Sequence, residues 1–262
     1  MHPLSKLEYI CIAVPVIPLP NRVLVKNPGF IFYTMNELEI MFAAFSAQRL
    51  SKYIAYNNGD AAQVVKHYKS NLRLAESLYV SLSIFEVTLR NALSRELRGF
   101  AGMEDWFELF YTTSELQPLI SDIDKAKRQI HHRGEVVTTN KIISELTFGF
   151  WVTLLNSQYE RVLWKSLRKA FPYMPKQIRK RKNVSAPCNS LRRLRNRIFH
   201  HESICWDLKY VTSLHEELIT VLGWMNAEMP QWLATIDNFN NVTTFIYNDM
   251  GWNNENKKET LS

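Results

Sequence analysis

Apolar residues recur at helical spacing along most of the chain, and this pattern predicts the main elements. The longest run, residues 60–99, is apolar most of the way round, which is typical of a helix at the centre of a bundle. Further helices are expected over residues 36–56, 114–133, 141–156, 159–171 and 207–226. Because glycine is scarce, at 8 residues, and the periodic runs are long, the sequence predicts an all-α protein.

The two ends of the chain lack this pattern. Residues 1–35 are punctuated by proline and fit no helical template, so we interpret them as an extended N-terminal segment. Residues 236–262 are rich in asparagine and other polar residues, which predicts a loosely ordered C-terminal tail. The sequence therefore predicts one helical bundle domain over residues 36–235, and Met35 could be the true start of the protein.

Charge and cysteine content narrow the function classes. The net charge of +7 and the pI near 9.2 suit a polyanionic partner such as nucleic acid. The 3 cysteines, Cys11, Cys188 and Cys205, form no closely spaced pair, so neither a disulfide framework nor a zinc site is indicated. No apolar run approaches the roughly 20 residues of a membrane-spanning helix, and no phosphate-loop motif is present. We therefore expect a cytoplasmic protein without a cofactor or a metal ion.

The densest group of chemically useful side chains is the stretch 191–203, LRRLRNRIFHHES. Its apolar residues Leu191, Leu194, Ile198 and Phe199 fall at helical spacing, so one face can dock on a core while the polar groups are held in place. Arginine supplies a permanent cation that binds phosphate, and histidine carries protons near neutral pH. Metal-free cleavage of a phosphodiester needs these groups, although a solvated basic helix with a terminal histidine pair would have the same composition.

Two further groups of polar residues accompany this stretch. Glu86 and Arg90 lie four residues apart in the central helix, beside Asn91, and can pair either as a structural ion pair or as support for a site. The connector at residues 172–189 is basic and bounded by prolines, so it could be solvated or contact a phosphate backbone. Because it leads directly into residues 191–203, contact with RNA is the favoured interpretation. Its cations are Lys176, Arg179, Lys180, Arg181 and Lys182.

Residues 195–202, RNRIFHHE, resemble the signature of the Abi-like family of bacterial abortive infection proteins. This family is placed in the HEPN superfamily of α-helical bundles, whose mark is an arginine followed, a few positions later, by a histidine. SAQRLSKYI at 46–54, FEVTLRNAL at 85–93 and ELTFGFWVTLL at 145–155 also resemble segments of the family, in the expected order. The resemblance covers about residues 36–235 and implies a HEPN-like helical bundle.

The resemblance implies a metal-independent endoribonuclease, acting in antiphage defence or as a toxin, whose site combines two copies of the motif across a homodimer. His200 would be the general base or acid when the ribose hydroxyl attacks the phosphate and leaves a cyclic phosphate end, with His201 as the alternative proton carrier. Arg195 would stabilise the charge of the transition state, and Asn196 would orient the phosphate or the imidazole. The supporting residues would be Glu86, Arg90, Asn91, Arg193, Arg197 and Glu202.

Several alternatives stay open. On an ideal helix Arg195 and His200 lie about 140° apart, whereas Asn196 would share a face with His200. Some HEPN toxins carry a tyrosine two residues after the histidine, which a partner nucleotidyltransferase modifies; Glu202 or Ser203 stands there in this chain, so that control is not expected. An antitoxin or another defence-system partner remains open. The alternative functions are a non-catalytic RNA-binding or protein-interaction module and a purely structural helical protein.

Overall fold

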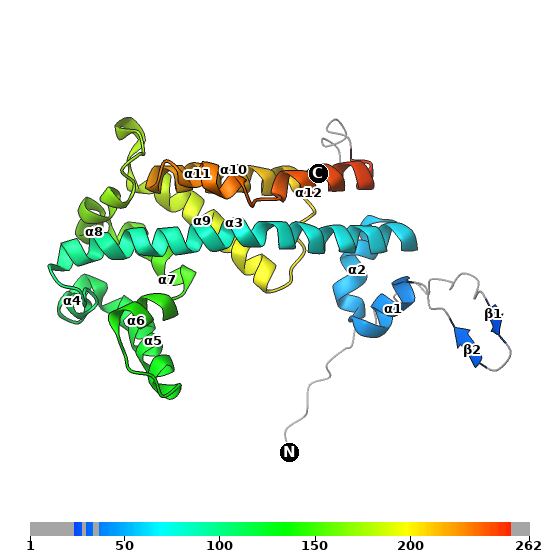
Figure 1. The fold of residues 1–262 in the computed structure, drawn as a ribbon, viewed down its shortest axis with the longest axis horizontal. Coiled ribbons are helices and arrows are strands. Elements are labelled where there is room, and N and C mark those ends of the chain that lie inside the picture. The colour runs from blue at the N-terminus through cyan, green and yellow to red at the C-terminus, as the bar shows by residue number, and fades with distance from the viewer. Residues whose placement is uncertain (1–23, 28–29, 34–36, 253–262) are drawn as a thin grey trace, which may run out of the picture. The chain divides into compact units, whose positions relative to one another are not determined.

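The protein is built mainly from helices, as the computed structural model in Figure 1 shows for the residues that it describes, 24–27, 30–33 and 37–252. Its α-helices are α1 (Glu37–Ala44), α2 (Ala47–Tyr56), α3 (Ala61–Ala101), α4 (Glu108–Thr112), α5 (Ile120–His132), α6 (Thr139–Glu145), α7 (Phe148–Thr153), α8 (Glu160–Leu167), α9 (Arg181–Phe199), α10 (Leu208–Met225), α11 (Met229–Ala234) and α12 (Phe239–Met250). Short 3₁₀ helices are η1 (Ser114–Leu119), η2 (Ser157–Tyr159), η3 (Arg168–Ala170) and η4 (Lys176–Ile178). The predicted all-α class is thus confirmed by the helices that make up most of the described residues. None of the described helices is both long enough and apolar enough to cross a membrane.

The chain divides into two compact units between Tyr68 and Lys69, inside helix α3. The domain bounds at residues 35 and 235 stay a prediction. The first unit contains a hairpin in which β1 (Leu24–Asn27) pairs antiparallel with β2 (Phe30–Tyr33). The segment predicted to be extended therefore contains two strands, and the rest of residues 1–35 lies outside the described ranges.

The helix expected over residues 36–56 is interrupted and forms α1 and α2. Ser46 caps α2, because its Oγ accepts the backbone N–H of Arg49 at 3.2 Å, and a cap of this kind starts a new helix. The first unit buries His67, whose ring meets the Tyr53 ring edge-on at 5.3 Å and whose Nδ1 lies 3.2 Å from the Asn57 amide nitrogen. Burial lowers the pKa of His67 to about 4, so this histidine is neutral at physiological pH.

The second unit has an aromatic core around Trp106. The Trp106 ring lies 5.3 Å from Phe110, 6.3 Å from Phe150 and 5.9 Å from Trp151, measured between ring centroids. These rings are buried, and the Trp106 Nε1–H donates to Ser94 Oγ on α3 at 3.2 Å. The apolar run predicted over residues 141–156 thus supplies part of the core that α3 covers.

The prediction of a loosely ordered tail is wrong for residues 239–250, which form α12. Phe239 and Ile246 on this helix are fully buried. Just before it, Asp237 Oδ2 lies 2.6 Å from His215 Nε2 on α10, and the His215 ring stacks on Phe239 at 4.1 Å. The asparagine-rich composition hid these apolar anchors, which recur at helical spacing.

Helix α9 lies among the other helices of the second unit and packs against α10 and α7. In the view of Figure 1, α10, α11 and α12 lie above the part of α3 that belongs to the second unit, and α4 to α7 lie below it. The buried apolar residues of α9 are Val184, Cys188, Leu191 and Leu194, which recur every three or four positions. This stripe fixes the helix, so the position of its C-terminal end is determined by core packing.

Candidate functional site

The predicted motif lies at the C-terminal end of α9. The helix begins at Arg181, so the expected connector over residues 172–189 includes its first turns. Leu191 and Leu194 are buried as predicted, but Phe199 is 48% exposed and does not dock on the core. The predicted apolar face is therefore correct only up to the last turn of the helix.

The histidine pair terminates the helix and is not part of it. His200 is the C-cap residue, and His201 adopts a left-handed conformation with φ of 56°. The His201 N–H donates to Ile198 O at 2.9 Å and the Glu202 N–H donates to Arg197 O at 2.8 Å, which is the hydrogen-bond pattern of a Schellman motif. Because the chain turns here, helical-wheel angles do not apply beyond Phe199, and both exposed imidazoles lie at the helix end.

The segment after the histidines is fixed by Asn71, a residue that the sequence reasoning missed. Asn71 on α3 is buried, and its Oδ1 accepts the N–H groups of Ile204 at 2.8 Å and Cys205 at 3.3 Å. The Ser203 hydroxyl lies 3.5 Å from the same oxygen. On the other side, the Arg197 guanidinium donates to Ser203 O. The available signal was spacing: Asn71 stands three residues before Leu74 and seven before Leu78, on the face that α3 buries, and a polar side chain on such a face needs hydrogen-bond partners.

The Arg195 side chain is held between two helices. Its guanidinium carbon lies 4.0 Å from the centroid of the Phe199 ring, a cation–π contact, and its Nε lies 3.7 Å from Glu86 Oε2 on α3. Burial raises the pKa of Glu86 above its ordinary value, while the guanidinium groups of Arg195 and Arg90 act in the opposite direction. The structure thus brings together the predicted residues Glu86, Arg90 and Arg195, and Phe199 joins them.

The remaining predicted residues near the motif have more open surroundings. Asn196 and Asn91 are exposed. Arg193 is also exposed, and its Nη2 donates to Ser190 Oγ at 2.9 Å, toward the preceding turn of α9. Glu202 is exposed and pairs with Arg197 at 3.4 Å, so it stabilises the turn that carries the histidines.

The basic connector separates into structural arginines and exposed lysines. The Arg179 guanidinium donates to the carbonyl oxygens of Pro172 and Met174. Arg181 pairs with Glu160 at 2.7 Å and donates to Leu155 O at 3.0 Å. These two arginines hold the fold together, whereas the lysines are exposed, namely Lys176, Lys180 and Lys182.

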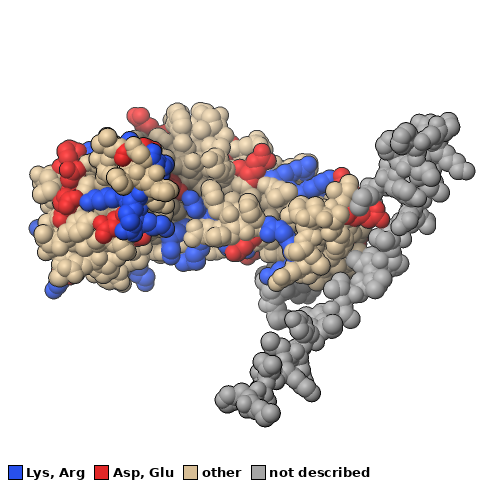
Figure 2. Space-filling view, turned by 90° about the horizontal axis from the view of Figure 1, so that it is seen from below, with Lys and Arg blue, Asp and Glu red and all other residues tan. Residues whose placement is uncertain are grey.

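The connector also lies far from the motif. Arg181 and Arg195 are 14 positions apart on one helix, which at the rise of an α-helix corresponds to about 20 Å along the axis. Proximity in the sequence therefore does not make the connector part of the histidine site. On the face shown in Figure 2, Lys and Arg side chains likewise form several separate groups with Asp and Glu between them.

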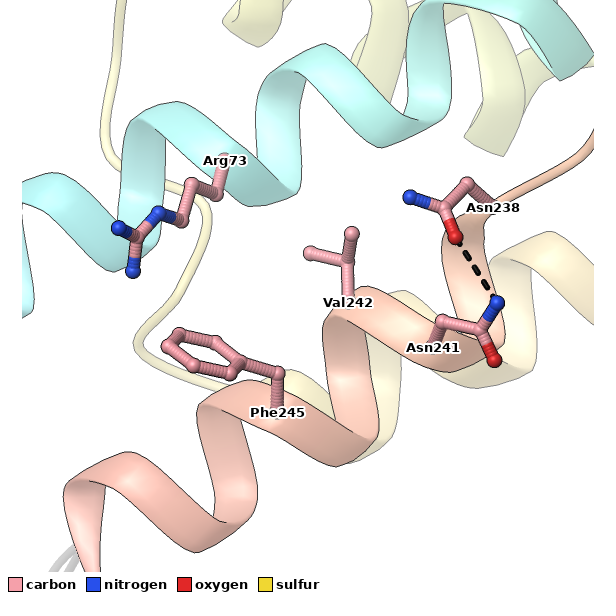
Figure 3. A pocket seen from close by; sticks show the side chains of 5 residues that line it. All are labelled: Arg73, Asn238, Asn241, Val242 and Phe245. Atoms are coloured by element: carbon pink, nitrogen blue, oxygen red, sulfur yellow. Dashed lines mark hydrogen bonds between the residues drawn. The ribbon is translucent and has the colours of Figure 1, made fainter.

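A shallow pocket of about 300 Å³ lies elsewhere in the second unit, between α3 and α12 (Figure 3). The Arg73 guanidinium carbon is 4.9 Å from the Phe245 ring centroid, and Asn241 donates to Asn238 at 2.9 Å. Val242 completes the lining, and none of the predicted residues contributes to it. Over the part of the chain that the structure describes, no group of three or more His, Cys, Asp or Glu side chains is placed to hold a metal ion.

Comparison of the chain with protein-family models, with curated proteins and with solved structures gave no match. The chemistry of the site therefore has to be inferred from its own groups. The end of α9 offers two exposed imidazoles that can carry protons and a fixed guanidinium that can bind an anion. This combination suits acid–base chemistry on an anionic substrate.

Proposed function

We propose that the protein is a metal-independent endoribonuclease of the HEPN type, acting in phage abortive infection or as a toxin. The observation that supports this most is the end of α9, where Arg195 is fixed on the Phe199 ring and His200 is exposed just beyond the last helical residue. The similarity of residues 195–202 to the Abi-like signature supplies the reaction type. A cytoplasmic location is part of the same proposal, because RNA is the substrate.

In this proposal His200 removes the proton from a ribose 2′-hydroxyl. The resulting oxygen attacks the adjacent phosphorus, the bond from phosphorus to the 5′-oxygen breaks, and a proton is delivered to that leaving oxygen. The products are a cyclic phosphate end and a 5′-hydroxyl end. Arg195 stabilises the additional negative charge on the phosphate oxygens during the transfer, and Asn196 hydrogen-bonds the phosphate or the imidazole. His201 is the alternative proton carrier.

A homodimer would supply a second histidine for the leaving oxygen. Apolar side chains beside the motif support such pairing: Phe199 is 48% exposed and Tyr79 on α3 is 59% exposed, with 6.5 Å between the two ring centroids. Leu72, seven residues before Tyr79 on the same face of α3, is 51% exposed. Exposed apolar groups that adjoin one another are typical of interaction surfaces. We propose that a second copy covers them and that an antitoxin or another defence-system protein regulates the pair.

RNA would extend from this site over basic surface. The exposed lysines Lys176, Lys180 and Lys182 are candidates for phosphate contacts, at a distance of several nucleotides from Arg195. Arg179 and Arg181 are less suited to this role, because their guanidinium groups already bind main-chain oxygens.

The test is cleavage of RNA by the purified protein in the presence of a chelator. The parent should produce ends with cyclic phosphate, and the variant His200→Asn should lose this activity. His201→Asn should keep most of it, because asparagine tolerates the left-handed conformation at this position and the main proton carrier is unchanged. Equal cleavage by His200→Asn and the parent would contradict the assignment.

The alternative function is an RNA-binding or protein-interaction module without catalysis. The observation in its favour is that the Glu86 carboxylate lies 3.7 Å from Arg195 Nε and offsets part of the positive charge that a transition state would need. This alternative predicts salt-sensitive binding of RNA that weakens in Arg195→Ala, with no cleavage products at any time.

A further inference from the structure

Two arginines share one carboxylate beside the motif. Glu86 Oε2 lies 3.7 Å from Arg195 Nε, and Arg90 follows Glu86 by one helical turn on α3. All three side chains are partly buried. Two cations therefore act on one anion in surroundings from which water is partly excluded, which leaves an excess of positive charge.

The hydrogen-bonding capacity of the two arginines is not fully used. A charge-assisted N–H···O bond is normally about 2.7–2.9 Å long, and the distance of 3.7 Å between Glu86 and Arg195 exceeds it. The Nε atoms of Arg90 and Arg195 are both closed to solvent and have no hydrogen-bond partner among the described residues. Buried donors without a partner are rare, and a ligand that supplies acceptors would remove their cost.

We propose that a phosphate group of a bound oligonucleotide displaces the Glu86 carboxylate and binds between Arg195 and Arg90, so that Glu86 is an internal competitor for the phosphate. The identity of the ligand rests on the proposed function. A phosphodiester offers two non-bridging oxygens that share one negative charge, and a guanidinium binds such oxygens through charge-assisted hydrogen bonds. The Phe199 ring keeps the Arg195 guanidinium in place when the carboxylate leaves.

This exchange has a consequence for selectivity. Because a phosphate must displace a carboxylate that the protein itself supplies, a small anion gains little from the exchange. An oligonucleotide adds contacts elsewhere on the protein, and these offset the loss of the Glu86 ion pair. The site should therefore favour phosphates that belong to a longer chain over inorganic phosphate.

The experiment measures binding of a short 2′-O-methyl oligoribonucleotide, which has no free 2′-hydroxyl and cannot be cleaved. Glu86→Gln removes the competing charge and should tighten binding about three- to tenfold at low salt, the size expected for one charge at several ångströms in a partly solvated site. Arg90→Gln should weaken binding by a similar factor. In an Arg195→Gln background the effect of Glu86→Gln should become smaller, since the two residues act on one another.

Glu76→Gln is the matched control, because this substitution changes the net charge by the same amount. Glu76 is exposed on α3, ten positions before Glu86. Circular dichroism and the melting temperature verify that each variant is folded. Binding by Glu86→Gln that is no tighter than binding by Glu76→Gln would overturn the proposal and would make Glu86 a positioning residue for Arg195. Absence of binding by both the parent and Glu86→Gln would overturn it as well.

Cleavage of unmodified RNA by the parent is measured separately. If Glu86→Gln binds the modified oligonucleotide more tightly while the parent does not cleave RNA, the phosphate site stands and the nuclease proposal fails. If the parent cleaves RNA and Glu86→Gln does not bind more tightly, the nuclease proposal stands and the competitor role fails.

Discussion

Replacement of Asn71 by leucine should destabilise the turn that carries the histidine pair. Asn71 is 4% exposed, and its Oδ1 accepts the N–H groups of Ile204 at 2.8 Å and Cys205 at 3.3 Å. Leucine has a similar shape but no acceptor, so both buried donors lose their partner. Because the two donors lie only three and four residues after His201, the change should also loosen the turn that carries His200, without a contact between residue 71 and the imidazole.

The structure gives the size of this effect. A buried donor left without a partner costs about 1–3 kcal/mol. The N–H groups of Ile204 and Cys205, which lie beside the partly exposed Ser203, should together cost about 2–4 kcal/mol. In a domain of 150–250 residues, one kcal/mol corresponds to roughly 2–4 °C in melting temperature, so the expected decrease is roughly 5–15 °C.

Urea unfolding measures the free-energy change, and hydrogen exchange of the Ile204 and Cys205 amides reports where it arises. Asn91→Leu is the control for stability, because Asn91 is exposed on the same helix and its replacement should change stability by less than about 0.5 kcal/mol. Asn71→Asp keeps an acceptor oxygen and should recover part of the loss. The reasoning would be refuted if Asn71→Leu were as stable as Asn91→Leu. It would also be refuted if the hydrogen-exchange rates of the Ile204 and Cys205 amides did not change.

The remaining predictions concern buried titratable groups. Burial raises the pKa of the Cys188 thiol to about 12 and that of the Cys205 thiol to about 11. In a Cys11→Ser variant, which leaves only these two cysteines, a thiol reagent at pH 8 should therefore react slowly until the chain is unfolded. Fast modification of the native protein would contradict this burial. His67 has a folded-state pKa of about 4, below its ordinary value of 6.5, so its contribution to stability is present above pH 6.5 and is lost as the pH falls toward 4. His67→Gln should make unfolding less dependent on pH over that interval, and an unchanged dependence in urea titrations would count against a buried neutral His67.

The sequence predicted the helical class and the core of the motif, because both follow from the spacing of apolar residues. Leu191 and Leu194 are buried as that spacing requires, and the long run over residues 60–99 is indeed one helix. Phe199 has the same spacing but is the last residue of α9, and its side chain is exposed. Periodicity indicates which face is apolar and does not reveal how far the neighbouring elements extend.

The site could be predicted only in part, since its contacts join distant segments. Arg195 on α9 pairs with Glu86 on α3, and Asn71 on α3 accepts the N–H groups of residues 204 and 205 just beyond α9. Both contacts depend on how α9 crosses α3, which no local pattern specifies. Likewise, the sequence did not separate Arg179 and Arg181 from the neighbouring lysines, because hydrogen bonds to main-chain oxygens leave no trace in composition.

The central claim is that Arg195 and His200 together cleave RNA without a metal ion, and the most direct measurement is the rate of RNA cleavage in excess chelator. The parent should cut, and His200→Ala and Arg195→Ala should each lose roughly 10²-fold or more in rate. Arg168→Ala, which removes one charge from an exposed residue outside the site, should cut like the parent. Cleavage that stops on addition of chelator, or equal rates for all four proteins, would contradict the account.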